Sequence, residues 1–395
     1  MAGASGGEAK SRREPVSRSP PSYLLWLATT NSDRTSFGRS GRVPVALSIP
    51  PSPDVLKAMT HFADAIRTVR GGQDLTAEQT GELIDTMLRG EADDDEIGSF
   101  LLALREKGEA VSELVGAARA MRRHMTPIRH DHAILLDTCG TGGSGSGTFN
   151  ISTAVAILAA ACGVAVAKHG NRKATSHSGS ADVLEVLGVR IESDAEAVSR
   201  SLDEIGICFC FAAKLHPAMK HVVAIRRRLG VPTLFNLLGP LCNPAAATHQ
   251  LLGTSDRSAQ QKIASAIARL GTTRSFVIHA DDGQDEVSLG GVTTVSDVTG
   301  DRQSSFELTP ASFGVPPCGH EALEAKDPSE SAAIIRHLFE GQPGPCRDTV
   351  VAGAATALHL IGKVDDVLEG ARVAAAAIDS GDGLRKLDEL RSFAG

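Results

Sequence analysis

The sequence predicts an α/β protein with a small N-terminal all-helical domain and a larger α/β domain built on a mainly parallel central sheet. Helical periodicity runs from residue 54 to about residue 125, and short apolar runs alternate with helical segments from Ala133 onward. The 395 residues are too many for one small core and suit two domains. We therefore expect a disordered leader or extension over 1–52, the helical domain over 53–125, optionally joined by part of 215–245, and the α/β domain over 126–395.

The composition excludes several classes of protein. Apolar residues make up 42% of the chain and charged residues 22%, which is ordinary for a globular protein. No stretch approaches the roughly 18 consecutive apolar residues that cross a membrane, and a net charge of −7 offers no electrostatic footprint for nucleic acid. The seven cysteines form no C-x-x-C pair or zinc spacing, which indicates free thiols in a reducing compartment. We therefore expect small-molecule partners, and neither nucleic acid nor a membrane.

The first 52 residues differ from the rest, with ten Ser, seven Lys or Arg and only three acids. Such a composition is typical of an organelle transit peptide, of a disordered tail, and of a start codon assigned too early. We expect a cytoplasmic protein, or a plastid protein if this leader is a transit peptide.

Four amphipathic helices are predicted in the first domain, because apolar residues recur at steps of three and four. The second and third begin with the capping sequences Thr76-x-x-Gln79 and Asp93-x-x-Glu96, and glycines mark their ends. Their apolar faces consist of Val55, Met59, Phe62, Ile66 and Val69; Leu83, Ile84, Met87 and Leu88; Ile97, Phe100, Leu101 and Leu104; and Val111, Leu114, Val115, Ala118 and Met121.

The second domain alternates short apolar runs with helical segments, which is the pattern of buried parallel strands joined by helices. The predicted strands lie at 134–136, 164–167, 208–212, 251–252 and 276–279, and two or three Ala-rich helices after Val350 close the chain.

A glycine-rich turn, D-T-C-G-T-G-G-S-G-S-G-T-F-N-I-S-T over 137–153, follows the first strand and precedes a helix. Glycines allow close approach of a ligand to the backbone, and free N–H groups at a helix start favour a phosphate. No Gly-Lys-Ser/Thr follows, so it is not a Walker loop. The G-x-G-x-x-G within 140–145 does not indicate a dinucleotide, because the next strand ends in Lys168 and not in an acid. A flexible linker fits poorly with the apolar segments on both sides.

Three further motifs carry charge. K-H-G-N-R-K-A-T-S-H-S-G-S-A-D over 168–182 follows the second strand, so it is expected beside the glycine turn at the carboxyl ends of the strands. Three arginines over 226–228 cannot share one helix face, so one of them can point inward toward a carboxylate. D-D-G-Q-D-E over 281–286 suits Mg²⁺, which prefers oxygen ligands, although an acidic turn alone is more often a solvated surface.

Together these motifs resemble the anthranilate phosphoribosyltransferase family, which catalyses the second step of tryptophan synthesis. The family pattern G-T-G-G-D…T-F-N-I-S-T, K-H-G-N-R…S-G-S-A-D-x-L-E-x-L-G, R-R-x-L-G…F-N-L-L-G-P-L-x-N-P and D-x-x-D-E occurs in this order with compatible spacing, over roughly residues 55–393. The resemblance implies the fold shared by nucleoside phosphorylases and these phosphoribosyltransferases, and a homodimer formed through the helical domain.

The resemblance also implies the reaction. The phosphoribosyl group of phosphoribosyl pyrophosphate (PRPP) passes to the amino group of anthranilate, with Mg²⁺ as cofactor and pyrophosphate as leaving group. Because the aniline nitrogen is a neutral nucleophile and the transition state is oxocarbenium-like, no covalent enzyme nucleophile is expected.

The site residues follow position by position. Anthranilate contacts are expected at Gly140, Asn171 and Arg226, with Arg226 facing the carboxylate, and Mg²⁺ ligands at Ser152, Asp285 and Glu286. The expected PRPP cradle comprises Gly140, Gly143, Ser144, Thr148, Asn150, Ile151, Ser152, Thr153, Lys168, His169, Gly170, Asn171, Arg172, Lys173, Ala174, Thr175, Ser176 and Ser180.

One position departs from the family pattern, because Ser144 stands where the family most often has Asp. A neutral hydroxyl there lowers repulsion of the pyrophosphate and removes an indirect hold on the metal shell. His177 is given no role.

Three rival functions fit the motifs less well. A pyrimidine-nucleoside phosphorylase would have different phosphate and base motifs in place of 168–172, and a nucleic-acid-binding relative would have a basic surface and would lack Asn171 and Arg226. An α/β protein that merely binds phosphate does not account for four motifs in order.

Overall fold

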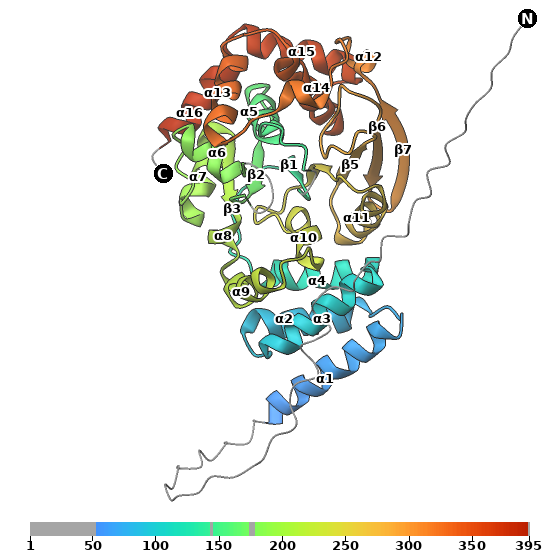
Figure 1. The fold of residues 1–395 in the computed structure, drawn as a ribbon. Helices are drawn as coiled ribbons and strands as arrows, with labels where there is room; N and C mark the ends of the chain where they lie inside the picture. Colours follow the sequence, from blue (N-terminus) through green and yellow to red (C-terminus); the bar gives the residue numbers. More distant parts are fainter. Residues whose placement is uncertain (1–52, 143–144, 174–177, 394–395) are drawn as a thin grey trace, which may run out of the picture. The chain divides into compact units, whose positions relative to one another are not determined.

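The computed structural model describes residues 53–142, 145–173 and 178–393, with side chains described from His61 onward. Its N-terminal part consists of helices at the four predicted positions (Figure 1), which confirms the small helical domain. These are α1 (Pro53–Arg70), α2 (Ala77–Arg89), α3 (Asp94–Lys107) and α4 (Val111–Arg123).

The predicted start signals act as helix caps. The Thr76 side chain accepts a hydrogen bond from the Gln79 backbone N–H at 3.2 Å, and the Gln79 side chain accepts one from the Thr76 N–H at 2.9 Å. The Asp93 carboxylate accepts from the Asp95 N–H at 2.8 Å at the start of α3. Each bond satisfies an N–H group that has no partner within its helix.

The central sheet has seven strands among the described residues, in the order β3-β2-β1-β4-β5-β6-β7. The first five run parallel to one another, which confirms the mainly parallel sheet. They overlap the predicted apolar runs, but β1 shares only Leu136 with the predicted strand at 134–136. These strands and their crossover helices are β1 (Leu136–Gly140), α5 (Ile151–Ala161), β2 (Val166–Gly170), α6 (Ser180–Val186), α7 (Ala195–Ile205), β3 (Ile207–Phe211), β4 (His249–Gly253), α11 (Arg257–Leu270) and β5 (Arg274–Ala280).

The edge of the sheet differs from expectation. β6 (Thr293–Thr299) and β7 (Arg302–Leu308) form an antiparallel hairpin that the sequence analysis did not predict. Most of β7 is exposed and β6 is buried only at intervals, so neither strand carries the continuous apolar run of a central strand. The turn at Gly300 between alternating residues was the available signal.

Each face of the sheet has its own apolar core, because successive side chains of a strand point to opposite faces. Phe276 and Ile278 of β5 pack in a cluster with α5 and the C-terminal helices, whereas Val277 packs on the other face with α11 and the N-terminal helices. The C-terminal helices, at the top of Figure 1, are α13 (Pro328–Phe339), α14 (Pro345–Leu360), α15 (Val367–Asp379) and α16 (Asp382–Ser392). No helix of the described residues is both long enough and apolar enough to span a membrane.

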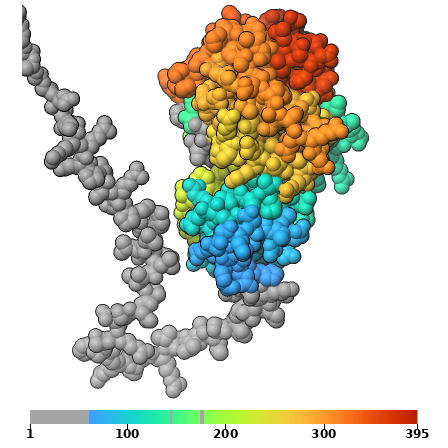
Figure 2. Space-filling view, turned by 90° about the vertical axis from the view of Figure 1, so that its right-hand side faces the viewer, coloured from blue at the N-terminus to red at the C-terminus, as the bar shows by residue number. Residues whose placement is uncertain are grey.

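An insert between β3 and β4 shares the core of the N-terminal helices. Its residues Val222, Ile225 and Leu234 are buried in the same cluster as the apolar faces of α2 to α4. Arg122 of α4 donates to the carbonyl of Leu241 at 2.8 Å, and Figure 2 shows the cyan part of the chain lying against the yellow part. The insert comprises α8 (Ala212–Leu215), η2 (Pro217–Met219), α9 (Lys220–Leu229), α10 (Leu234–Leu238) and η3 (Gly239–Leu241); the remaining short elements are α12 (Pro310–Phe313) and η4 (His320–Leu323).

Candidate active site

The acidic loop after β5 packs directly on the carboxyl ends of β1 and β4. A Cβ atom added to Gly140 would lie 2.7 Å from Asp285 Oδ2, and one added to Gly253 would overlap the Asp285 backbone. Only glycine therefore fits at position 253, and a side chain at position 140 would displace the Asp285 carboxylate. This contact joins the predicted metal-binding loop to the start of the glycine turn.

Three of the predicted motifs meet beside this contact. The Ser152 backbone N–H donates to Glu286 Oε1 at 3.0 Å, and Lys168 Nζ donates to Ser152 Oγ at 3.2 Å. Lys168 also donates to the Thr138 carbonyl at 2.7 Å, and only 3% of the residue is exposed. The structure thus places a buried ammonium group, a hydroxyl and a carboxylate together at the carboxyl edge of a parallel sheet, where ligands of α/β proteins bind.

Burial changes the pKa values of the two charged side chains in this cluster, Glu286 and Lys168. Burial and the neighbouring Asp285 carboxylate together raise the pKa of Glu286 to about 8, while the positive charge of Lys168 opposes the shift. Burial lowers the pKa of Lys168, and the negative charges of Asp137 and Glu286 oppose that change. Two carboxylates in a partly buried place favour a bound cation, because a cation relieves their repulsion.

The donors at this place fit Mg²⁺. They are oxygen atoms of Ser152, Asp285 and Glu286, and Mg²⁺ is commonly held by one or two carboxylates with substrate phosphates and waters completing its shell. Within the described part of the chain, no group of three or more His, Cys, Asp and Glu side chains is placed to hold a metal ion. A protein-only metal cage is therefore not formed there, and a site completed by substrate oxygens agrees with the donors present.

The start of α5 differs from the expectation of free phosphate donors. The Ile151 N–H donates to Phe149 O at 2.7 Å, the Ser152 N–H donates to Glu286, and the Thr153 N–H donates to Asn150 O at 3.1 Å. The side chains of Ile151 and Thr153 are buried in the core. The first N–H groups of the helix are thus already used within the chain, so free donors have to come from the glycine turn itself.

The glycine turn has the backbone conformation that glycine alone adopts easily. Gly142, Gly145 and Gly147 have φ values of 68°, 65° and 67°. Thr148 Oγ1 lies 3.2 Å from Ser146 Oγ, and Thr148 forms an isolated bridge with Glu324. The predicted contacts Gly143, Ser144, Ala174, Thr175 and Ser176, together with His177, lie outside the described residues.

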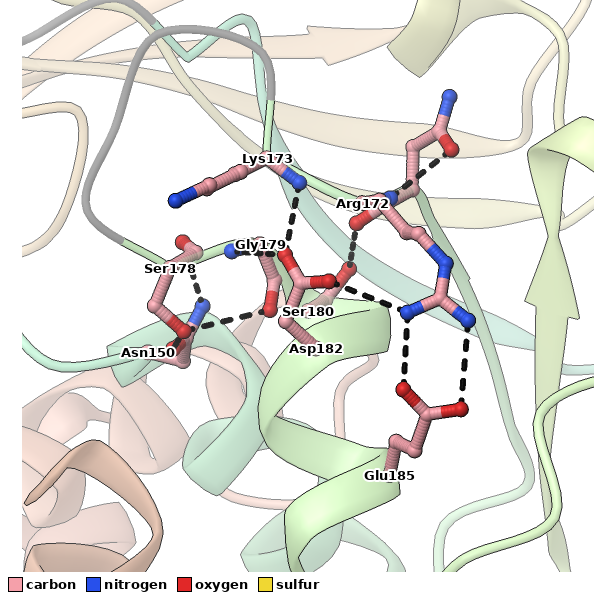
Figure 3. Close-up of polar contacts among 9 residues, drawn as sticks. Asn150, Arg172, Lys173, Ser178, Gly179, Ser180, Asp182 and Glu185 are labelled. Atoms are coloured by element: carbon pink, nitrogen blue, oxygen red, sulfur yellow. Dashed lines mark hydrogen bonds and ion pairs between the residues drawn. The ribbon is translucent and has the colours of Figure 1, made fainter. Parts of the chain in front are cut away.

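Asn150 links the two predicted phosphate-binding segments. Its Oδ1 accepts hydrogen bonds from Ser178 Oγ at 2.7 Å and from Ser331 Oγ at 2.9 Å, and its Nδ2 donates to the Ser178 carbonyl at 3.2 Å. Figure 3 shows Asn150 directed at Ser178. Ser331 was not predicted as a site residue, because a lone serine on the distant helix α13 gives no sequence signal.

His169 is paired with a second histidine that the sequence analysis missed. Its Nδ1 lies 3.0 Å from the Gly239 carbonyl and therefore donates, so its Nε2 accepts from His216 Nε2 at 3.2 Å. Burial lowers the pKa of His169 to about 4 and that of His216 to about 3. Both rings are neutral at pH 7, and they join β2 to the helical insert.

Arg226 is the arginine of the predicted triplet that points inward. Its Nη2 donates to Asn236 Oδ1 at 3.3 Å, and its guanidinium lies 5.4 Å from the centre of the Phe235 ring. Burial lowers its pKa, and no carboxylate of the described residues forms an ion pair with it. Arg228, two residues further on, is instead paired with Asp94 at 3.5 Å. A partly buried guanidinium without a counter-ion is suited to an anionic ligand.

The other predicted contacts lie after β2. Asn171 is exposed, its Oδ1 accepts from the Arg172 N–H at 2.8 Å, and no contact joins it to Arg226 in the described structure. The Arg172 guanidinium is paired with Glu185 at 2.8 and 3.2 Å and with Asp182 at 3.3 Å (Figure 3), so its charge is already neutralised within the chain.

Comparison with known proteins gives the family. Residues 132–384 match the model of the glycosyl transferase family α/β domain, and residues 63–125 match that of the glycosyl transferase family helical bundle domain. An anthranilate phosphoribosyltransferase from Rhodopirellula baltica is 68% identical over 329 residues, which are 83% of this chain and 96% of that protein. The chain belongs to the anthranilate phosphoribosyltransferase family. It is therefore an enzyme, a glycosyltransferase that transfers a pentosyl group.

Further relatives agree with this family. The anthranilate phosphoribosyltransferase from Symbiobacterium thermophilum is 44% identical over 83% of this chain and 96% of its own length. The crystal structure of the family member from Thermus thermophilus has a TM-score of 0.78 and 40% identity, covering 84% of this chain and 99% of that one. The member from Saccharomyces cerevisiae in complex with PRPP and Mg has a TM-score of 0.77 and 27% identity, covering 87% and 98%.

Proposed function

We propose that this chain transfers the phosphoribosyl group of PRPP to the amino group of anthranilate, giving N-(5-phosphoribosyl)anthranilate and pyrophosphate. This reaction is the second step of tryptophan biosynthesis from chorismate. The observation that carries the proposal is the meeting of Ser152, Lys168 and Glu286 at the carboxyl ends of the parallel strands. Two structures of the Saccharomyces cerevisiae relative support it, since one holds PRPP and Mg and the other holds 4-fluoroanthranilate.

Magnesium belongs to this proposal. Ser152, Asp285 and Glu286 would hold the ion together with oxygen atoms of the substrate. The bound ion neutralises charge on the departing pyrophosphate.

The residues of the chain would divide the remaining work between the two substrates. The buried ammonium of Lys168 and the N–H groups of the glycine turn stabilise negative charge that develops on the leaving group. Arg226 holds the carboxylate of anthranilate, and its partly buried position strengthens that interaction. The aniline nitrogen then attacks ribose C1 from a fixed orientation, and no covalent bond to the protein is formed.

The proposal also includes further PRPP contacts, the domain division, the oligomeric state and the location of the protein. We also propose PRPP contacts at Gly140, Thr148, Gly170, Lys173 and Ser180, which lie at the ends of β1 and β2 or in the segments that follow them. The domain division at about residue 125 is supported by the family matches, because the helical bundle match ends at residue 125 and the α/β domain match begins at residue 132. The proposal of a homodimer through the helical domain rests on the family resemblance. A cytoplasmic location agrees with the bacterial relatives, which give no support to the plastid alternative.

The test measures pyrophosphate release from PRPP in the presence of Mg²⁺, with and without anthranilate. We expect release that depends on anthranilate and on Mg²⁺, with formation of one N-(5-phosphoribosyl)anthranilate per pyrophosphate. Release at the same rate without anthranilate would refute the proposed function.

A further inference from the structure

The segment that follows β2 packs backbone-to-backbone against the start of α6. A Cβ atom added to Gly179 would lie 2.4 Å from the Lys173 nitrogen and 2.7 Å from the Asn171 carbonyl oxygen. The Asn171 carbonyl also accepts a hydrogen bond from the Ala181 N–H at 3.2 Å and one from Ser180 Oγ at 3.4 Å. Residues 171–173 are therefore positioned by the beginning of α6.

One carboxylate holds both sides of this contact. Asp182 Oδ2 accepts the Lys173 N–H at 2.8 Å and the Gly179 N–H at 3.0 Å. Its other oxygen, Oδ1, lies 3.3 Å from Arg172 Nη1. Figure 3 shows the Asp182 side chain between these groups, with 16% of its surface exposed. Hydrogen bonds to a carboxylate are stronger than those to a neutral acceptor, so this residue is suited to fixing the two backbone segments against each other.

The neighbouring acid Glu185 makes a different contact, so the pairing of Arg172 can be tested separately from the backbone connection. Glu185, one turn further along α6, pairs with the Arg172 guanidinium and accepts no hydrogen bond from the described backbone between 171 and 179. Its side chain is 55% exposed, and exposed ion pairs contribute little to stability. Removing Glu185 therefore changes the charge pairing of Arg172 and leaves the backbone connection in place.

We propose that Asp182 is a positioning residue, which joins Lys173 to Gly179 and thereby holds Asn171 and Lys173 where the two substrates bind. This inference rests on the proposed function, because Asn171 and Lys173 are its expected substrate contacts. Asp182 itself is not among the expected substrate contacts. A displacement of contacts by about 1 Å can lower a rate by on the order of a hundredfold, so the loss of this carboxylate has a large effect on catalysis.

The test compares four variants by steady-state kinetics with both substrates, by thermal unfolding and by amide hydrogen exchange. We expect Asp182→Ala to lower kcat/KM for PRPP and for anthranilate by on the order of tenfold to a hundredfold. Asp182→Asn recovers part of the loss, since its amide oxygen can accept both N–H groups. Glu185→Ala stays within about twofold of the wild type. Gly179→Ala, which leaves the carboxylate intact, lowers kcat/KM because its methyl group displaces Lys173.

Hydrogen exchange reports the connection directly. The Lys173 and Gly179 amides exchange faster in Asp182→Ala and at the wild-type rate in Glu185→Ala. Wild-type kcat/KM in Asp182→Ala overturns the proposal, as does an equal loss in Glu185→Ala. If Asp182→Ala does not fold, Gly179→Ala decides, and wild-type kinetics in that variant overturn the proposal. A wild-type enzyme without anthranilate-dependent pyrophosphate release refutes the function alone, because the exchange rates of the two amides can still be measured.

Discussion

Replacing Arg226 by Ala tests how anthranilate is recognised. The guanidinium has a weak hydrogen bond of 3.3 Å to Asn236 and forms no ion pair among the described residues, so most of its bonding capacity is available to a ligand carboxylate. A charged hydrogen bond contributes about 1.5–3 kcal/mol, and loss of the partly buried pair costs about 2–3 kcal/mol in total. We expect KM for anthranilate to rise by about 30-fold to 150-fold, since each 1.4 kcal/mol corresponds to roughly tenfold. KM for PRPP is expected to change less than about threefold.

The assay is pyrophosphate release under steady-state conditions, with each substrate varied while the other is saturating. Arg228→Ala is the matched control, because Arg228 lies on the same helix and its charge is paired with Asp94 at the surface. Arg226→Lys is expected to give an intermediate loss of about tenfold, because a lysine keeps the charge and lacks the planar fork. Equal increases in both KM values, or the same loss in Arg228→Ala, would refute the role given to Arg226.

Three further predictions concern stability and metal dependence. The folded-state pKa values of His169 and His216, about 4 and about 3, lie below the ordinary value, so the unfolded chain binds more protons between pH 6.5 and 4. The contribution of these two rings to stability is therefore greatest above about pH 6.5 and falls on acidification by about 1.4 kcal/mol per pH unit for each ring; urea unfolding of the wild type and of His216→Gln at several pH values checks this, and the same pH slope in both proteins contradicts it. Gly116→Ala is expected to destabilise the protein by about 1–3 kcal/mol, because the added methyl group would overlap the Ala77 backbone between α4 and α2; an unchanged urea midpoint would show that the helices can separate freely. Chelation of divalent ions is expected to abolish pyrophosphate release and added Mg²⁺ to restore it, with full activity in chelator as the contrary result.

The fold could largely be predicted from the sequence because its repeated patterns correspond to regular burial. The apolar residues of the N-terminal segment recur with helical periodicity, and helices form there. The apolar runs after Ala133 and before Lys168 are typical of buried strands, and strands form there. The hairpin β6–β7 could not be predicted in the same way. Its stability comes from pairing along the edge of an existing sheet, and its outer strand has mostly exposed side chains that leave no apolar pattern.

The candidate site, like the fold, could be predicted from the sequence only in part. Ser152 and Asp285 follow β1 and β5, and Lys168 lies in β2 near its carboxyl end, so strand order and motif chemistry predict their meeting. The partners that fix this arrangement, such as Asp182 and His216, are single residues whose contacts arise from tertiary packing. The first N–H groups of α5 were expected to bind phosphate, yet they bond within the chain. A carboxylate from a distant loop accepts the Ser152 N–H, and nearby backbone carbonyls accept those of Ile151 and Thr153.

The shared core beneath the sheet has a consequence for how this enzyme evolves and can be engineered. The N-terminal helices, the insert with Val222 and Leu234, and the β-strand residues Cys139 and Leu252 belong to one apolar cluster. The helical bundle is therefore not a detachable module that can be exchanged alone between relatives. A functional chimera has to bring the insert from the same parent as the bundle, and the insert carries Arg226, so recombination at this border also exchanges part of the binding site.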